Sequence, residues 1–145
     1  MLRSILILSI LILFPNYLIA ADQYETEPND TKGSADLIVE TGIYYLYGHA
    51  WFDDMDWFAI SITEPGVIIV SLNVPSAPEF NDDYYRYIYD PVGVQIGYMR
   101  DAGDQVIMLP KSGTYYLLLE RSYYGTDAQY ALQIDVTNFS NQCPE

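Results

Sequence analysis

Two short acidic segments hold most of the side chains in this sequence that can do chemistry. Residues 25–30 read Glu-Thr-Glu-Pro-Asn-Asp, and residues 53–56 read Asp-Asp-Met-Asp. Calcium takes roughly six to eight oxygen ligands from carboxylates, amide carbonyls and water. Side chains alternate along an extended chain, so Glu25, Glu27 and Asn29 face the same side. The first segment therefore presents several oxygens to one point, and we expect Asp53 and Asp56 to complete the shell.

The same residues have a simpler interpretation. Acidic runs are usually solvated surface, and Asn-Asp is common turn material. The spacing does not match an EF-hand loop, so the predicted calcium site rests on the clustering of oxygens. Pro28 stiffens the first segment and keeps Glu27 out of helical conformation, which favours the extended arrangement.

The composition limits the possible functions. The 145 residues include 20 acidic and 6 basic ones, for a formal charge of −14, and the length suits one domain. Half of the residues are hydrophobic and 15% are aromatic, which is too apolar for a disordered acidic chain. The acidic balance argues against nucleic acid and against docking on anionic membranes, and it fits cation binding.

Residues 1–21 have the features of a secretory signal peptide. Arg3 precedes the apolar run Ile5–Phe14, and Ala20 and Ala21 are small cleavage-site residues. A retained membrane anchor is the rival interpretation, but the run is shorter than the ~20 residues that a span needs. We therefore expect a secreted protein, extracellular or periplasmic, with no membrane span after cleavage.

The mature chain is predicted to be one domain, residues 22–137, followed by a tail, residues 138–145. The only cysteine, Cys143, lies in that tail, so no intramolecular disulfide can form and the role of this thiol stays open. A secreted domain without disulfides has reason to use a metal for stability.

The pattern of the mature chain is all-β. Short segments rich in β-forming residues are separated by turn signals such as Glu64-Pro65-Gly66, and no long helical period appears. This pattern indicates a sandwich or a barrel of about eight or nine short strands. We expect strands within residues 31–39, 42–47, 57–62, 67–74, 84–89, 94–99, 105–109, 114–120 and 129–136.

The sequence has 15 tyrosines, more than a core of this size needs. In the expected strand 84–89, alternation places Tyr85, Tyr87 and Tyr89 on one face and the other three residues on the opposite face. One face belongs to the core, and the other can form an aromatic binding platform. Tyrosine is also an ordinary β-former, so the pattern has a purely structural interpretation as well. The candidate ligand-binding residues are Tyr85, Tyr87, Tyr89 and Tyr116.

Five motifs in order resemble the bacterial pre-peptidase C-terminal domain, a family that includes the collagen-binding domains of clostridial collagenases. The similarity covers about residues 24–136 and implies a jelly-roll-like antiparallel β-sandwich. The motifs are Glu25-x-Glu27-Pro28-Asn29-Asp30, Ala35-Asp36 with Gly42, Asp54-x-Asp56-Trp57-Phe58, Ser112-Gly113-Thr114-Tyr115-Tyr116-Leu117 and Tyr130-x-Leu132-x-Ile134.

The resemblance also implies a set of calcium ligands. It places a backbone carbonyl ligand near Gly48, and five carboxylates suit two adjacent ions better than one. The implied ligand positions are Glu25, Glu27, Asn29, Asp30, Gly48, Asp53 and Asp56.

These observations predict a secreted, calcium-stabilised, monomeric binding module for an extracellular protein or polysaccharide. The alternative is a structural or secretion-assisting domain associated with a secreted peptidase. An enzyme is not expected: His49 is the only histidine, and the sequence has neither a nucleophile elbow nor an HExxH motif.

Overall fold

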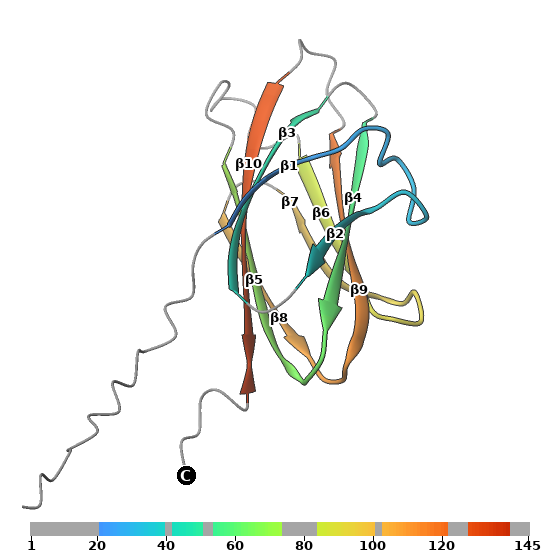
Figure 1. Ribbon diagram of the computed structural model, residues 1–145, viewed down its shortest axis with the longest axis vertical. Helices are drawn as coiled ribbons and strands as arrows, with labels where there is room; N and C mark the ends of the chain where they lie inside the picture. The colour runs from blue at the N-terminus through green and yellow to red at the C-terminus, as the bar shows by residue number, and fades with distance from the viewer. Residues whose placement is uncertain are drawn as a thin grey trace, which may run out of the picture.

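The computed structural model describes residues 21–39, 42–50, 54–73, 84–100, 103–121 and 128–139. These residues form two five-stranded sheets (Figure 1). In spatial order, sheet A contains β1 (Ala21–Tyr24), β3 (Gly42–Ala50), β10 (Ala128–Asn138), β5 (Gly66–Asn73) and β8 (Gly103–Leu109). Sheet B contains β2 (Asp36–Val39), β4 (Met55–Ile62), β9 (Gly113–Arg121), β6 (Tyr84–Tyr89) and β7 (Gln95–Arg100).

The prediction of an all-β sandwich is confirmed, and the nine expected strands correspond to β2 to β10. The expectation missed β1, a strand of four residues with polar Asp22 and Gln23 in its middle. It also missed two parallel pairings, β1 with β3 and β2 with β4. In both pairs, the chain crosses to the other sheet between the two strands. A tight hairpin forces neighbouring strands to be antiparallel, but such a crossing allows a parallel pair.

The core forms where the inward faces of the two sheets meet. Alternation along β4 buries Phe58, Ile60 and Ile62, while β5 buries Ile68 and Val70 from the opposite side. Each fully buried side chain of this kind contributes roughly 1.5–3 kcal/mol relative to an exposed one. The hydrophobic pattern thus accounts for the sandwich directly.

Strand β6 divides its residues between the core and solvent. Tyr84, Arg86 and Ile88 are completely buried, so the alternating set Tyr85, Tyr87 and Tyr89 lies on the outer face of sheet B. The core face of this strand is therefore the one that contains an arginine.

Arg86 connects the two sheets through the core. Its Nη1 donates hydrogen bonds to the carbonyl oxygen of Val70 on β5 at 2.9 Å and to that of Gly103 on β8 at 2.7 Å. A buried guanidinium needs such acceptors, because desolvation of a charged group is costly. Arg86 therefore fixes sheet B against sheet A with directional bonds.

Several expectations fall outside the described residues. They are residues 1–20 of the expected signal peptide, Asp53, Cys143 and the tail from residue 140 onward, while residue 21 of that peptide is the first residue of β1. Among the described residues, no helix is long and apolar enough to cross a membrane.

We predict that Arg86→Ala lowers the free energy of unfolding by about 3 kcal/mol, because it leaves a cavity and removes both hydrogen bonds between the sheets. Arg100, which is exposed at the end of β7, is the matched control, and Arg100→Ala should cost less than about 1 kcal/mol. Urea unfolding of both variants measures the difference. Equal, small effects would contradict the cross-sheet role.

Candidate metal site

The loop between β1 and β2 crosses from the edge of sheet A to the edge of sheet B (Figure 1). Backbone hydrogen bonds hold its first half to both sheets. The Glu25 N–H donates to the carbonyl of Tyr47 on β3 at 3.0 Å, and the Trp57 N–H on β4 donates to the carbonyl of Asn29 at 3.1 Å. The loop is thereby fixed across the open end of the sandwich.

Asp36, the first residue of β2, organises the inside of this loop. Its Oδ2 accepts hydrogen bonds from the Thr26 N–H at 2.7 Å and from the Asn29 side-chain amide at 3.4 Å. The Asn29 N–H in turn donates to Glu27 Oε2 at 3.1 Å. Sequence reasoning included Asp36 in a motif but gave it no role. The only indication in the sequence that Asp36 has a structural role was its position immediately before a run of β-forming residues.

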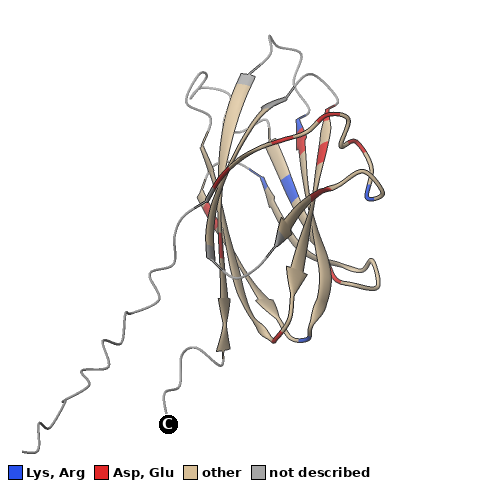
Figure 2. Ribbon diagram, in the orientation of Figure 1, with Lys and Arg blue, Asp and Glu red and all other residues tan. Residues whose placement is uncertain are grey.

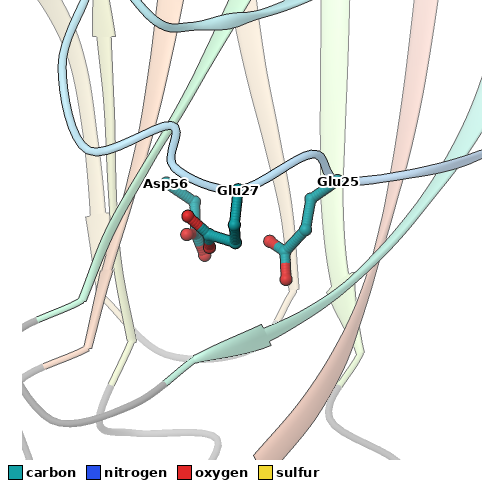
Figure 3. Close-up of side chains that lie close together, drawn as sticks. All are labelled: Glu25, Glu27 and Asp56. Atoms are coloured by element: carbon teal, nitrogen blue, oxygen red, sulfur yellow. The ribbon is translucent and has the colours of Figure 1, made fainter.

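Two carboxylates of this loop and one from β4 meet in one place. One oxygen each from Glu25, Glu27 and Asp56 lie within 4.8 Å of one another. Figure 3 shows the two glutamates extending from the loop toward Asp56, which comes from β4. Acidic residues are visible along the loop and on the adjoining strands in Figure 2. The two acidic segments of the sequence are thus neighbours in space.

Asp56 is the buried member of the group, with 1% of its surface exposed. Neither of its carboxylate oxygens accepts a hydrogen bond of good geometry from the described residues, and the same holds for the side-chain oxygen of the fully buried Asn29. Buried acceptors without donors are destabilising, typically by about 1–3 kcal/mol each and by more for charged groups. A cation would compensate for these acceptors.

The electrostatics agree with this geometry. Burial raises the pKa of Asp56 to about 9, and the neighbouring carboxylates of Glu25 and Asp54 act in the same direction, while a hydrogen bond from the Tyr130 hydroxyl acts against them. Without a metal, the folded protein therefore holds a proton on Asp56 at neutral pH.

Tyr130 and Gly48 form the wall of the site on the side of sheet A, where they face each other between β10 and β3. The Tyr130 hydroxyl donates a hydrogen bond to Glu25 Oε2 at 2.5 Å. Burial, followed by the charges of Asp56 and Glu25, raises the Tyr130 pKa well above its ordinary value. A side chain at Gly48 would collide with both the Glu25 carboxylate and the Tyr130 hydroxyl. Only glycine leaves room for Glu25 here.

The other predicted ligands have different positions. Asp30 is exposed and is not part of the three-carboxylate group. Asn29 is buried, and its amide nitrogen faces Asp36. Gly48 lies against Glu25, and Asp53 is outside the described residues. Tyr130, which contacts Glu25 directly, was noted in the sequence only as part of a strand motif.

The predicted aromatic residues lie on the outer face of sheet B in two groups. Tyr85 and Tyr87 pack with Tyr98 of β7, with ring centroids 6.3 and 5.3 Å from that of Tyr98. Tyr89 and Tyr116 pack around Trp57 of β4, with centroids 5.5 and 6.5 Å from its ring. Trp57 and Tyr98 thus extend the predicted set from β4 across β9 and β6 to the edge strand β7.

Comparisons with known proteins identify the fold. No family model and no curated protein sequence matches this chain. The pre-peptidase C-terminal domain of collagenase from Bacillus anthracis is similar in structure, with a TM-score of 0.55 and 18% identity over 70% of this chain and 94% of that one. The chain therefore has the fold of a pre-peptidase C-terminal domain.

Two periplasmic inhibitors of g-type lysozyme have a similar fold. PliG from Aeromonas hydrophila has a TM-score of 0.55 and 13% identity, over 81% of this chain and 97% of that one. PliG from Salmonella Typhimurium has a TM-score of 0.50 and 16% identity, over 71% of this chain and 99% of that one. At these identities the likeness concerns the fold.

The Asp56 pKa gives a prediction for the metal-free protein. The unfolded chain releases this proton near the ordinary value of 3.8, whereas the folded chain retains it up to about pH 9. Between these values the folded state binds more protons, so stability falls as pH rises, by at most about 1.4 kcal/mol per pH unit. Thermal unfolding in EGTA from pH 5 to pH 9 measures this slope.

Asp56→Asn is the matched variant for that experiment, since the amide cannot ionise. Its melting temperature in EGTA should depend less on pH than that of the natural protein and should be higher at pH 8. The same pH slope in both proteins would show that Asp56 is not the titrating group.

Proposed function

We propose that this protein is a secreted or periplasmic binding module whose β-sandwich is stabilised by calcium. The observation that supports this most is the buried carboxylate of Asp56, which lies close to the carboxylates of Glu25 and Glu27, with the Tyr130 hydroxyl as the neighbouring donor that lowers its pKa. Three carboxylates in one partly buried place repel one another unless a cation or protons neutralise them.

The donor set favours calcium among common metals. The available atoms are carboxylate oxygens and the side-chain oxygen of Asn29, with no described cysteine or histidine in the group. Hard oxygen donors in an irregular arrangement suit calcium, whereas zinc and copper prefer nitrogen or sulfur. When bound, the ion would neutralise the carboxylates and hold the β1–β2 loop against β4.

The three clustered carboxylates support one ion. Under this proposal a second ion would need Asp30 and Asp53, together with the carbonyl near Gly48. Such a pair of ions would also reduce the excess negative charge of the chain, which is −14 in total.

The aromatic outer face of sheet B is the proposed ligand-binding surface. Tyr85, Tyr87 and Tyr98 form a packed set of rings there, and Tyr98 is 53% exposed. Tyrosine offers a large contact area and a hydroxyl at low entropic cost. The similar structures include a domain of a collagenase and inhibitors of a lysozyme, which supports an extracellular protein or polysaccharide as the target.

The alternative is a structural or secretion-assisting domain that binds metal but no further ligand. It would share the calcium site but not the aromatic surface function. We propose no catalytic residues in either case.

Calcium should raise the melting temperature, and EGTA should lower it. At a calcium concentration about 100 times the Kd, stabilisation of about 2.7 kcal/mol corresponds to a shift of roughly 5 °C or more. Differential scanning calorimetry measures it. Asp56→Ala should abolish the shift, and Glu64→Gln, in the exposed turn between β4 and β5, should retain it. No shift at millimolar calcium would refute the metal site.

Binding to solid-phase collagen, polysaccharides and cell-wall material tests the aromatic surface. The natural protein should be retained on at least one of these, and replacing Tyr87 and Tyr98 together by alanine should reduce retention at least tenfold. Tyr24→Ala is the matched control, because this tyrosine is 74% exposed but lies on sheet A. If the natural protein binds none of these materials, the structural alternative is favoured.

A further inference from the structure

Three aromatic rings on the outer face of sheet B surround a single ammonium group. The Nζ of Lys32 lies 4.4 Å from the ring centroid of Tyr89, 5.2 Å from that of Trp57 and 5.3 Å from that of Tyr116. Three adjacent strands, β4, β9 and β6, supply the rings. We call these three rings the cage.

The cage has the geometry of an ammonium-binding site. A cation within about 6 Å of a ring centroid is attracted by the electron-rich face, and Trp and Tyr are effective partners. The Trp57 and Tyr116 rings stand at 74° to each other, so they approach the cation from different directions. Gly93 bounds the cage from the turn after β6, where a β-carbon would lie 3.8 Å from the Lys32 Nζ.

Lys32 enters the cage from a short turn that has its own hydrogen bonds. The Ser34 N–H donates to the Thr31 carbonyl at 3.0 Å, and the Thr31 N–H donates to Ser34 Oγ at 3.2 Å. Thr31, Gly33 and Ser34 are exposed. These hydrogen bonds lie within the turn and would stay intact if Lys32 left the cage.

We propose that the cage is a recognition site for a lysine side chain of a protein partner, with Lys32 as the resident occupant that the partner's lysine displaces. The inference rests on the proposed binding role of the sheet B face and names the chemistry of its target. The cage already holds a primary ammonium on an unbranched four-carbon stem, which is the group that a partner's lysine would present.

The charge of the chain supports a basic partner. With 20 acidic and 6 basic residues, the protein attracts cationic surfaces and steers them toward itself. Lys32, tethered to the same chain, competes at an effective concentration in the millimolar range. A partner that also contacts Tyr85, Tyr87 and Tyr98 would gain enough contact area to overcome this competition.

The experiment uses the full mature chain with Lys32→Ala, which empties the cage. The probe is N-acetyl-lysine N-methylamide, and the neutral control is N-acetyl-norleucine N-methylamide, which has the same stem length but lacks the ammonium. NMR titration follows the indole N–H signal of Trp57, assigned with Trp57→Phe. Lys32→Gln serves as a second variant should the alanine variant fold poorly.

The lysine probe should give saturable shifts of the Trp57 signal in Lys32→Ala, with at least tenfold weaker binding to the natural protein. The norleucine probe should give none, and adding Tyr89→Leu should remove the response. No saturable shift in either Lys32 variant, or an equal response to norleucine, would overturn the proposal.

Parallel measurements separate this proposal from the function on which it rests. Calcium-dependent melting and retention on collagen and polysaccharides are measured with the same samples. Normal calcium stabilisation and retention without lysine binding would reject the cage as a lysine site alone. Lysine binding without retention on any material would reject the proposed targets and leave the cage in place.

Discussion

The structure depends on how the buried carboxylate of Asp56 is neutralised. This group lies buried on β4, and two further carboxylates face it from the β1–β2 loop. An isolated buried charge is too costly to persist, so the group must bind either a proton or a cation. The protonated state and the cation-bound state differ in how the β1–β2 loop is held against β4. A proton neutralises Asp56 alone, whereas a divalent ion would bind all three carboxylates and join the loop to the strand.

Both sheets contribute to this site, which is why the loop matters for the whole sandwich. Glu25 follows β1 and bonds to Tyr130 of sheet A, whereas Asp56 and Asp36 belong to sheet B. Arg86 makes a second connection between the sheets at the other side of the core. With one cysteine in the chain, no internal disulfide can provide such a link. Directional polar contacts at two places do so instead, and the hydrophobic core between them supplies most of the stability.

The sequence predicted the strands well because alternation over eight residues, as in β4 and β5, is a strong local signal. It also predicted that Glu25, Glu27 and Asp56 would lie together, and their carboxylates do, whereas the metal role stays a prediction. It did not assign the roles of Asp36, Tyr130 and Lys32. Those roles depend on contacts between residues far apart in the chain, such as Tyr130 with Glu25, and local patterns do not contain that information. Likewise, periodicity divided the tyrosines of β6 into two faces, but only packing shows which face includes the buried Arg86.

The β1–β2 loop contributes residues to both the proposed metal site and the cage. Its first half directs Glu25 and Glu27 toward Asp56, and Lys32, three residues after Asn29, reaches the aromatic rings outside sheet B. The Trp57 N–H binds the carbonyl of Asn29, while the Trp57 ring forms one side of the cage. A cation that tightens the first half would therefore also restrict the turn that carries Lys32. If both proposals hold, affinity at the cage and affinity for the metal would be linked, since a coupling through a shared segment acts equally in both directions.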